Sequence, residues 1–252
     1  MKAIILSAGR GSRLLPMTTD TPKCALAVGD RTLIEHQIER LLEQGIASIT
    51  VVVGFGAERV EQLLAARYDP RRVTTLYNPF FQVADNLASC WMARGEMNDD
   101  FVLLNGDTLF EPAVLTRLLA APTHPITLAT DHKPHYDADD MKVSLRGNRL
   151  VRIGKRLARE RTDGESIGMM LLRKPGTAAF RAALDRAVRR PQGLEQWYLS
   201  VIDELADSGQ VRTQSMRGLS WIEVDTPADL EQAVVQVQSP RWTREGRLWR
   251  VA

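Results

Sequence analysis

The sequence predicts an α/β protein in which a mostly parallel, Rossmann-like sheet is flanked by helices. Short apolar segments such as Lys2–Leu6 and Ser48–Val53 alternate with stretches of helical periodicity such as Leu33–Gln44. This alternation is typical of parallel strands joined by crossover helices, with both faces of the sheet covered. In the second half, short strands separated by turns predict an additional small β-rich subregion.

The N-terminal half contains most of the predicted parallel sheet. Strands are predicted at Lys2–Leu6, Ser48–Val53, Val73–Tyr77, Phe101–Leu104 and Ile126–Thr130, and helices at Leu33–Gln44, Ala57–Ala66 and Glu111–Leu119. Gly45 ends the first helix as a C′ glycine, and Pro112 stands in the first turn of the third. Because ligands bind at the carboxyl ends of such strands, the residues that follow each strand are site candidates.

The C-terminal half completes the sheet and forms the β-rich subregion. Strands are predicted at Met141–Leu145, Leu150–Ile153, Ser166–Leu172 and Trp221–Val224, and helices at Phe180–Ala187, Gln196–Ala206 and Ala228–Val235. Since no linker rich in Gly, Pro or Ser divides the chain, residues 1–238 are predicted to form one domain. Residues 239–252 form a C-terminal extension that either packs through its tryptophans or serves as a docking or dimer contact. Its basic and aromatic residues are Arg241, Trp242, Arg244, Arg247, Trp249 and Arg250.

Composition and charge argue against several classes of function. The 252 residues carry 33 basic and 31 acidic side chains, so no overall charge favours nucleic acid as a partner. Cys24 and Cys90 are too few for a disulfide framework and lack the spacing of zinc ligands. No segment has the apolar length of a transmembrane helix, and Ala3–Leu6 is too short for a signal peptide. We therefore expect a cytoplasmic protein without membrane insertion, and homo-oligomerisation stays open.

The loop after the first strand carries a phosphate-binding pattern. It reads Ser7-Ala8-Gly9-Arg10-Gly11-Ser12-Arg13-Leu14 and is followed by Pro22-Lys23. Glycines let backbone N–H groups approach an anion, and Arg10, Arg13 and Lys23 add charged donors for phosphate oxygens. The dinucleotide fingerprint would need a glycine at Leu14, and the Gly-Lys-Ser/Thr of the P-loop is absent from the sequence. The loop therefore predicts a triphosphate site.

This pattern resembles the signature of the nucleotidyltransferase family that includes sugar-1-phosphate nucleotidyltransferases. The matching residues are Ile4 to Leu14, then Pro16, Met17, Thr18, Pro22, Lys23 and Leu33-Ile34-Glu35. Within the family, the chain is most similar to bacterial-type CTP:phosphocholine cytidylyltransferases. That similarity rests on Asn78-Pro79 with Asp85 to Ser89, Met141 to Val143 with Ile153 to Lys155, and Gly164 to Gly168 with Trp221 to Asp225. Many sugar nucleotidyltransferases have two adjacent glycines where Ala8-Gly9 stands here, which disfavours a sugar phosphate.

The resemblance implies a magnesium ion held by Asp107 and Asp225. Each follows a predicted strand, and in an α/β sheet both carboxylates could project into one crevice. Mg²⁺ prefers a few carboxylates together with phosphates and water. The alternative is that each aspartate caps the helix that follows it. Glu223 is a weaker candidate, which we expect on the opposite face of the strand from Asp225.

The resemblance also places the base of the nucleotide between Ser7–Gly9, the turn at Asn78 and the segment from Asn86 to Ser89. An asparagine suits a pyrimidine edge because its side chain offers a donor and an acceptor. The alternative, weighed equally, is that Asn78 and Asn86 only cap turns.

For the acceptor, the resemblance implies Lys142 and Lys155 near the attacking phosphate and Glu165 in the pocket wall. A choline head would need aromatic faces and a carboxylate. The aromatic candidates are Trp91, Tyr136, Trp197, Tyr198 and Trp221, and the acidic ones are Asp85, Asp137 and Asp139. The segment with His132, His135 and Asp140 is predicted to be a solvated loop rather than a metal cluster.

Taken with the resemblance, the sequence predicts a magnesium-dependent transfer of CMP from CTP to a small phosphorylated or phosphonate substrate such as phosphocholine. Pyrophosphate leaves, and Arg13, Lys23, Lys142 and Lys155 act as the catalytic cations. One alternative is a sugar-1-phosphate nucleotidyltransferase that uses UTP, GTP or dTTP. Another is a catalytically silent nucleotide-binding regulatory module, against which the presence of Asp107, Arg13 and Lys23 argues.

Overall fold

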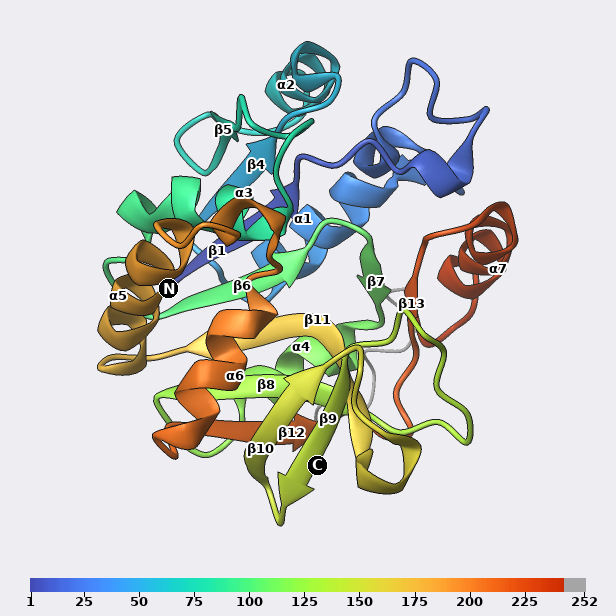
Figure 1. Ribbon diagram of the computed structural model, residues 1–252. Coiled ribbons are helices and arrows are strands. Elements are labelled where there is room, and N and C mark those ends of the chain that lie inside the picture. The colour runs from blue at the N-terminus through green and yellow to red at the C-terminus, as the bar shows by residue number, and fades with distance from the viewer. Residues whose placement is uncertain (243–252) are drawn as a thin grey trace.

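In the computed structural model, which describes residues 1–242, the N-terminal half is built on parallel strands (Figure 1). β1 (Lys2–Ser7) lies between β4 (Ser48–Val53) and β6 (Phe101–Asn105), and β5 (Val73–Tyr77) pairs with β4. All these pairs are parallel. Ile4 and Ile5, which point to opposite faces of β1, are both fully buried.

Helices cover both faces of the sheet and explain this burial (Figure 1). One core contains side chains of α1 (Leu33–Glu43), α2 (Ala57–Ala65) and α4 (Pro112–Leu119) together with Ile5. The other core contains side chains of α3 (Asn86–Met92), α5 (Gly176–Val188) and α6 (Leu199–Asp207) together with Ile4. The predicted α/β class is confirmed.

The C-terminal half adds antiparallel strands to the predicted parallel ones. β11 (Gly164–Leu172) runs antiparallel to β6 and to β8 (Ile126–Asp131), whereas β12 (Val211–Ser215) is parallel to β8. β9 (Lys142–Arg146) and β10 (Arg149–Gly154) form a hairpin, because a short turn can join only antiparallel neighbours. The sheet of the described residues is therefore mixed, with the order β5-β4-β1-β6-β11-β8-β12-β10-β9.

Two small strand pairs lie outside this sheet. β2 (Ala27–Val28) pairs with β3 (Arg31–Thr32), and β7 (Thr108–Phe110) pairs with β13 (Trp221–Glu223). The second pair has a functional consequence, because β7 follows Asp107 directly and β13 leads to Asp225. The N–H of Val224 donates to the carbonyl of Asp107 over 3.0 Å, which holds the two aspartates beside each other.

The last helix of the domain and the first residues of the C-terminal extension pack against the rest of the chain. α7 (Pro227–Val237) starts at a capping box formed by Thr226 and Asp229. Trp242 is 2% exposed, lies in a small core with residues such as Val28, and accepts a hydrogen bond from Arg40 at its carbonyl. The other residues of the extension named above lie outside the described residues, and so does the packing or docking role predicted for them; they are Arg244, Arg247, Trp249 and Arg250.

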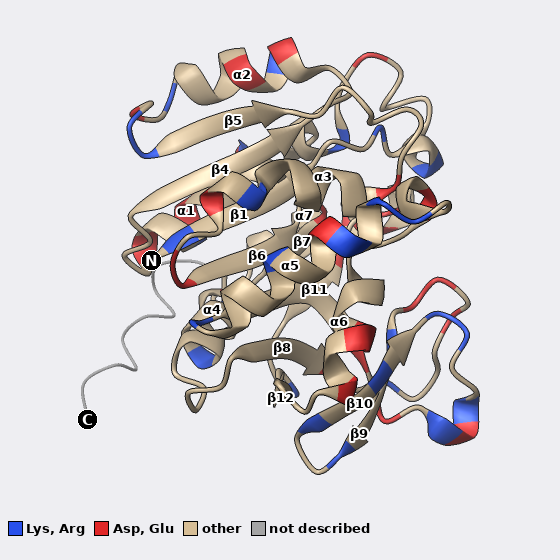
Figure 2. Cartoon of the chain, turned by 60° about the vertical axis from the view of Figure 1, so that its left-hand side comes forward, with Lys and Arg blue, Asp and Glu red and all other residues tan. Residues whose placement is uncertain are grey.

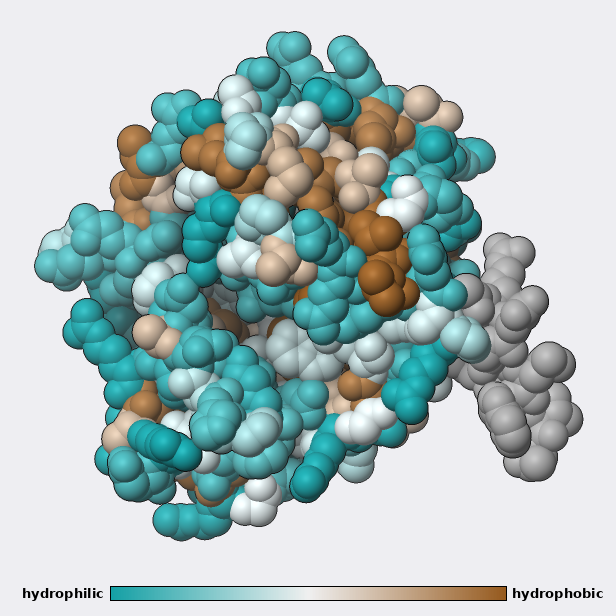
Figure 3. Space-filling model, turned by 90° about the vertical axis from the view of Figure 1, so that its right-hand side faces the viewer, coloured by the Kyte–Doolittle hydropathy of each residue, from teal (hydrophilic) through white to brown (hydrophobic). Residues whose placement is uncertain are grey.

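The surface agrees with the balanced composition. In Figure 2, acidic and basic segments alternate over helices and loops, and basic residues gather on the β9–β10 hairpin. The space-filling view in Figure 3 shows a recess bordered mainly by hydrophilic residues. Within residues 1–242, no helix has the length and apolar character needed to cross a membrane.

Candidate active site

A cavity of about 1010 Å³ opens at the carboxyl ends of β1 and β6. It collects most of the predicted site residues, although they come from distant parts of the chain. Those in its wall are Ser7, Ala8, Gly9, Gly11, Arg13, Lys23, Asp85, Asn86, Ser89, Asp107, Lys155, Glu165, Trp197, Trp221 and Asp225. Six predicted residues are not in the wall, namely Arg10, Asn78, Trp91, Tyr136, Lys142 and Tyr198.

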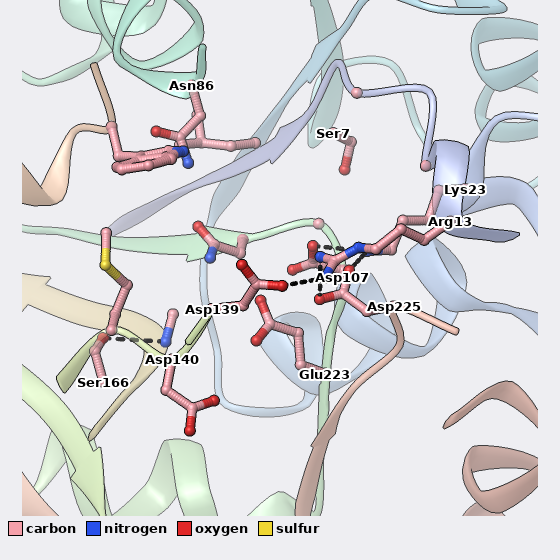
Figure 4. Close-up of a pocket in the computed structure, with 18 of the residues that line it drawn as sticks. Ser7, Arg13, Lys23, Asn86, Asp107, Asp139, Asp140, Ser166, Glu223 and Asp225 are labelled. Atoms are coloured by element: carbon pink, nitrogen blue, oxygen red, sulfur yellow. Dashed lines mark hydrogen bonds and ion pairs between the residues drawn. The ribbon is translucent and has the colours of Figure 1, made fainter. Parts of the chain in front are cut away.

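The centre of the cavity is a network of opposite charges (Figure 4). The Nζ atom of Lys23 lies 2.9 Å from an oxygen of Asp107 and 2.5 Å from an oxygen of Asp225. Arg13 donates to the second oxygen of Asp225 over 2.7 Å and to Asp139 over 2.8 Å. The phosphate-binding loop and both predicted metal ligands therefore meet at one point.

The capping alternative for the two aspartates is wrong. α7 is capped by Thr226, whose side chain accepts from the N–H of Asp229. α4 starts at Glu111 without a side-chain cap. Since the carboxylates of Asp107 and Asp225 point instead at Lys23, they are available to the cavity.

These two carboxylates fit a magnesium ion. Oδ1 of Asp107 is buried and has no hydrogen-bond partner among the described residues, which leaves it free to bind a cation. Within residues 1–242, no cluster of three or more His, Cys, Asp or Glu side chains is arranged to hold a metal. An ion at Asp107 and Asp225 would take its other ligands from phosphates and water, as Mg²⁺ commonly does.

The electrostatics of this centre keep Lys23 charged. Burial alone would lower the pKa of Lys23, but the carboxylates of Asp107 and Asp225 outweigh that effect and raise it. Glu223 also lines the cavity and was not among the predicted site residues. Desolvation by the surrounding protein raises the pKa of Glu223, and the negative charges of Asp107 and Asp225 raise it further. The side chain of Glu223 is nevertheless exposed to the cavity. The expectation that Glu223 faces away from Asp225 is wrong, because residues two apart in a strand share a face and both residues line this cavity.

The predicted base-binding residues divide into two groups. Asn86 and Ser89, both on α3, line the cavity, and Oδ1 of Asn86 accepts from the N–H of Tyr198 over 3.0 Å. Asn78 is fully buried behind them, where it donates to Oγ of Ser89 over 2.9 Å and accepts from the N–H of Phe80. Asn78 therefore caps a turn and positions Ser89, which was the alternative interpretation.

Arg10 points away from the predicted triphosphate. Its guanidinium carbon lies 5.0 Å from the ring centroid of Phe55, in a cation–π contact on the surface. Arg13 and Lys23 are therefore the loop cations that reach the cavity.

The opposite end of the cavity is acidic. Glu165 on β11 is 4% exposed and lies 3.0 Å from Nζ of Lys133, which also contacts Asp140 over 2.8 Å. Burial raises the pKa of Glu165 to about 7, against the opposing effect of Lys133. Lys133 was not predicted as a site residue, because a single lysine in a polar loop is not part of any recognisable sequence motif.

Trp197 supplies the exposed aromatic face of this end. Nζ of Lys155 lies 4.2 Å from the Trp197 ring centroid and 3.7 Å from a carboxylate oxygen of Asp139. Trp221 also lines the cavity, and its indole N–H donates to Asp131 over 2.7 Å.

Other predicted acceptor residues have structural contacts instead. Lys142 is buried, and its ammonium donates to the carbonyls of Asp137 (2.5 Å) and Lys155 (2.9 Å), which ties the 132–141 loop to β10. The hydroxyl of Tyr136 lies 3.1 Å from Nδ1 of His132. The prediction that these two residues contact the acceptor is not supported by their placement, because neither is in the cavity wall.

The remaining aromatic candidates are also outside the acceptor end. The indole of Trp91 donates to Asp185 over 2.7 Å. Tyr198 is fully buried, and its hydroxyl donates to Oδ1 of Asn105 over 3.1 Å.

Known proteins share both the sequence pattern and the fold. Residues 3–203 match the family model of the MobA-like NTP transferase domain. The chain is 31% identical over 247 residues to the CMP-5'-(3-aminopropyl)phosphonate synthase of Streptomyces rubellomurinus, covering 96% of this chain and 39% of that protein. It is 39% identical over 111 residues to the choline-phosphate cytidylyltransferase of Streptococcus pneumoniae, covering 44% of this chain and 47% of that protein. The inositol-1-phosphate CTP transferase of T. maritima has the same fold, with a TM-score of 0.79, 21% identity and coverage of 94% of this chain and 96% of that chain.

These matches confirm the resemblance to nucleotidyltransferases that the loop pattern indicated. The chain spans 39% of the length of the phosphonate synthase, and the segment aligned with the choline-phosphate cytidylyltransferase covers 47% of that protein. The residues matched by the family model, 3–203, contain the phosphate-binding loop and Asp107, whereas Asp225 follows them in the sequence.

Proposed function

The chain belongs to the family of MobA-like NTP transferase domains, and on this basis we propose that it transfers CMP from CTP to a small phosphate or phosphonate carrying an ammonium group. Two similar proteins, a CMP-aminopropylphosphonate synthase and a choline-phosphate cytidylyltransferase, support CTP as the donor and an amine-bearing acceptor. The observation that carries the proposal is the charge of the cavity wall.

Acidic residues outnumber basic ones in this wall, even without Glu165 and Glu223, whose pKa values are raised. The acidic residues are Asp85, Asp107, Asp137, Asp139, Asp140, Glu165, Glu223, Asp225 and Asp229, and the basic ones are Arg13, Lys23, Lys133 and Lys155. An anionic sugar phosphate would gain little from the surplus carboxylates, whereas an ammonium group would be attracted to them. The acceptor therefore pairs an anionic phosphate or phosphonate with a cationic end.

Two lysine side chains of the protein itself indicate which kind of cation the acidic end can bind. Lys133 places its ammonium between Asp140 and Glu165, and Lys155 places its own between Trp197 and Asp139. A primary ammonium can donate to such carboxylates, whereas a quaternary one needs several aromatic faces. We therefore favour a primary amine over choline as the cationic end.

The reaction is an in-line displacement at phosphorus. An oxygen of the acceptor's phosphate or phosphonate forms a bond to the α-phosphorus of CTP, and the bond from that phosphorus to the bridging oxygen of the β-phosphate breaks. The electron pair of the broken bond leaves with pyrophosphate, and no proton need be removed from an anionic nucleophile. Arg13 and Lys23 orient the triphosphate and offset its charge.

Magnesium would be held by Asp107 and Asp225, and when bound it would neutralise charge on the phosphates. Asp107 offers its unpartnered Oδ1, and Lys23 already shows that a cation is stable between the two carboxylates. Lys23 can then contact the phosphates themselves, since its ammonium lies in the same cavity.

The proposal is tested by pyrophosphate release with Mg²⁺, using the four NTPs crossed with aminoethylphosphonate, aminopropylphosphonate, phosphocholine and glucose 1-phosphate. We expect turnover with CTP and the primary amines, and none in the Asp107→Ala variant. Turnover only with a sugar phosphate would contradict the acceptor class, and tight nucleotide binding without turnover on any acceptor would favour a regulatory module.

A further inference from the structure

Asn105 occupies the place where the two halves of the cavity meet. It ends β6, which lies between β1 and β11 in the sheet. β1 leads into the phosphate-binding loop and β11 carries Glu165 of the acidic end, and Figure 4 shows Ser7 and Ser166 of these two strands on opposite sides of the pocket. In an in-line reaction the α-phosphorus lies between the attacking oxygen of the acceptor and the departing pyrophosphate. Because β6 lies between the strand of the phosphate-binding loop and the strand of the acidic end, we infer that the α-phosphorus is bound beside the end of β6.

The side chain of Asn105 has a fixed orientation. Its Oδ1 accepts from the hydroxyl of Tyr198 over 3.1 Å, and Tyr198 is fully buried. Its backbone carbonyl accepts from the side chain of Gln37 over 2.8 Å. With Oδ1 engaged, the Nδ2 group is left as the free end of the amide.

That free end has no hydrogen-bond partner within residues 1–242, and Asn105 is part of the cavity wall. Nδ2 is not fully buried, so it is accessible from the cavity that Asn105 lines. Asn105 therefore offers two N–H donors in the cavity wall, two residues before Asp107.

Gly168 makes room for this arrangement. It lies on β11 opposite the end of β6, with φ +71°, and a Cβ atom there would stand 2.7 Å from Nδ2 of Asn105. A larger residue would both strain the backbone and push the amide aside. The hydrogen bond from Tyr198 and the close packing of Gly168 thus hold the Asn105 amide in one orientation.

We propose that Asn105 donates a hydrogen bond from Nδ2 to an oxygen of the α-phosphate as the acceptor attacks, and that Tyr198 is the positioning residue that keeps this donor aimed. The inference rests on the proposed transfer of CMP. The fixed donor already contacts this oxygen in bound CTP, and because charge grows on the phosphoryl oxygens during the attack, the contact lowers the barrier more than it strengthens ground-state binding.

The test is the steady-state kinetics of Asn105→Ala, Asn105→Asp and Tyr198→Phe with CTP and an aminoalkylphosphonate. We expect kcat to fall about 100-fold in both Asn105 variants and about 10-fold in Tyr198→Phe, with KM for CTP changed less than about threefold. Asn148→Ala and Tyr68→Phe, which alter the same residue types outside the cavity, should match the wild type.

Equal kcat values in the wild type and both Asn105 variants would overturn the proposal, and so would a loss confined to KM. If the wild type itself does not turn over, the proposed function fails, and the ³¹P resonance of the α-phosphorus in bound CTP tests Asn105 separately. Asn105→Ala should shift this resonance and Asn148→Ala should not. An unmoved resonance in Asn105→Ala would then overturn the inference.

Discussion

Replacing Glu165 with glutamine should remove a pH-dependent penalty from the folded state. Glu165 is 4% exposed, and burial raises its pKa to about 7 from an ordinary value of 4.5. Below pH 4.5 the carboxyl is neutral in both the folded and the unfolded chain. Between pH 4.5 and 7 the unfolded chain ionises first, so the free energy of unfolding falls as the pH rises, and above pH 7 the loss is complete. Glutamine cannot ionise and has no such loss.

The magnitude follows from the two pKa values. One pKa unit corresponds to about 1.4 kcal/mol, so full ionisation of Glu165 costs the folded state about 3 kcal/mol. A small part of that cost is already present at pH 5. Between pH 5 and pH 8 the stability of Glu165→Gln should therefore rise relative to the wild type by about 2.5 kcal/mol. For a chain of this length the melting temperature would move by about 5–10 °C.

Denaturant unfolding of both proteins at pH 5 and pH 8 measures this difference. Comparing the two pH values cancels any constant effect of the substitution on packing. Glu160→Gln, at an exposed position of the neighbouring short helix Arg159–Arg161, is the matched control and should give the same difference at both pH values. A stability difference for Glu165→Gln that is unchanged between pH 5 and pH 8 would refute the reasoning.

Three further changes test the charged centre and its packing. Asp107→Asn keeps the shape but removes the charge, so pyrophosphate release should fall about 10³-fold with an unchanged circular dichroism spectrum, and near-normal turnover would rule out Asp107 as a ligand. Lys23→Met leaves two carboxylates without their shared cation, and kcat should fall about 10²-fold or more; a change in KM alone would show that Lys23 only binds nucleotide. Gly106→Ala places a Cβ atom 2.0 Å from Oγ of Ser7 and should destabilise the protein by about 1–3 kcal/mol in denaturant. Gly154→Ala, which meets open space, should change stability less, and equal effects would contradict the packing argument.

Sequence patterns predicted the elements that bury a regular apolar face. The bounds of β4 and β5 agree with the prediction, because β-branched residues in a short run indicate a strand without any tertiary information. β12 was missed because Val211–Ser215 is mostly polar, and its pairing with β8 and β10 depends on the sheet around it. α3 was missed because only seven residues, Asn86–Met92, form it, too few to show a helical period clearly.

The same division applies to the site. Arg13, Lys23 and Asp107 were predicted, since a loop motif and the end of a strand are visible in the sequence itself. Lys133 and Asn105 were not, because their roles depend on tertiary contacts. Lys133 contacts Glu165 only when the 132–141 loop folds against β11. Asn105 is oriented by Tyr198, which lies 93 positions away in the sequence.

The most direct test of the central claim is the identity of the product formed from CTP and aminoethylphosphonate with Mg²⁺. ³¹P NMR and mass spectrometry should show one new compound in which CMP is joined to the phosphonate, with one pyrophosphate formed for each molecule of product. Hydrolysis of CTP to CMP and pyrophosphate without a coupled product, or unchanged CTP, would contradict the account.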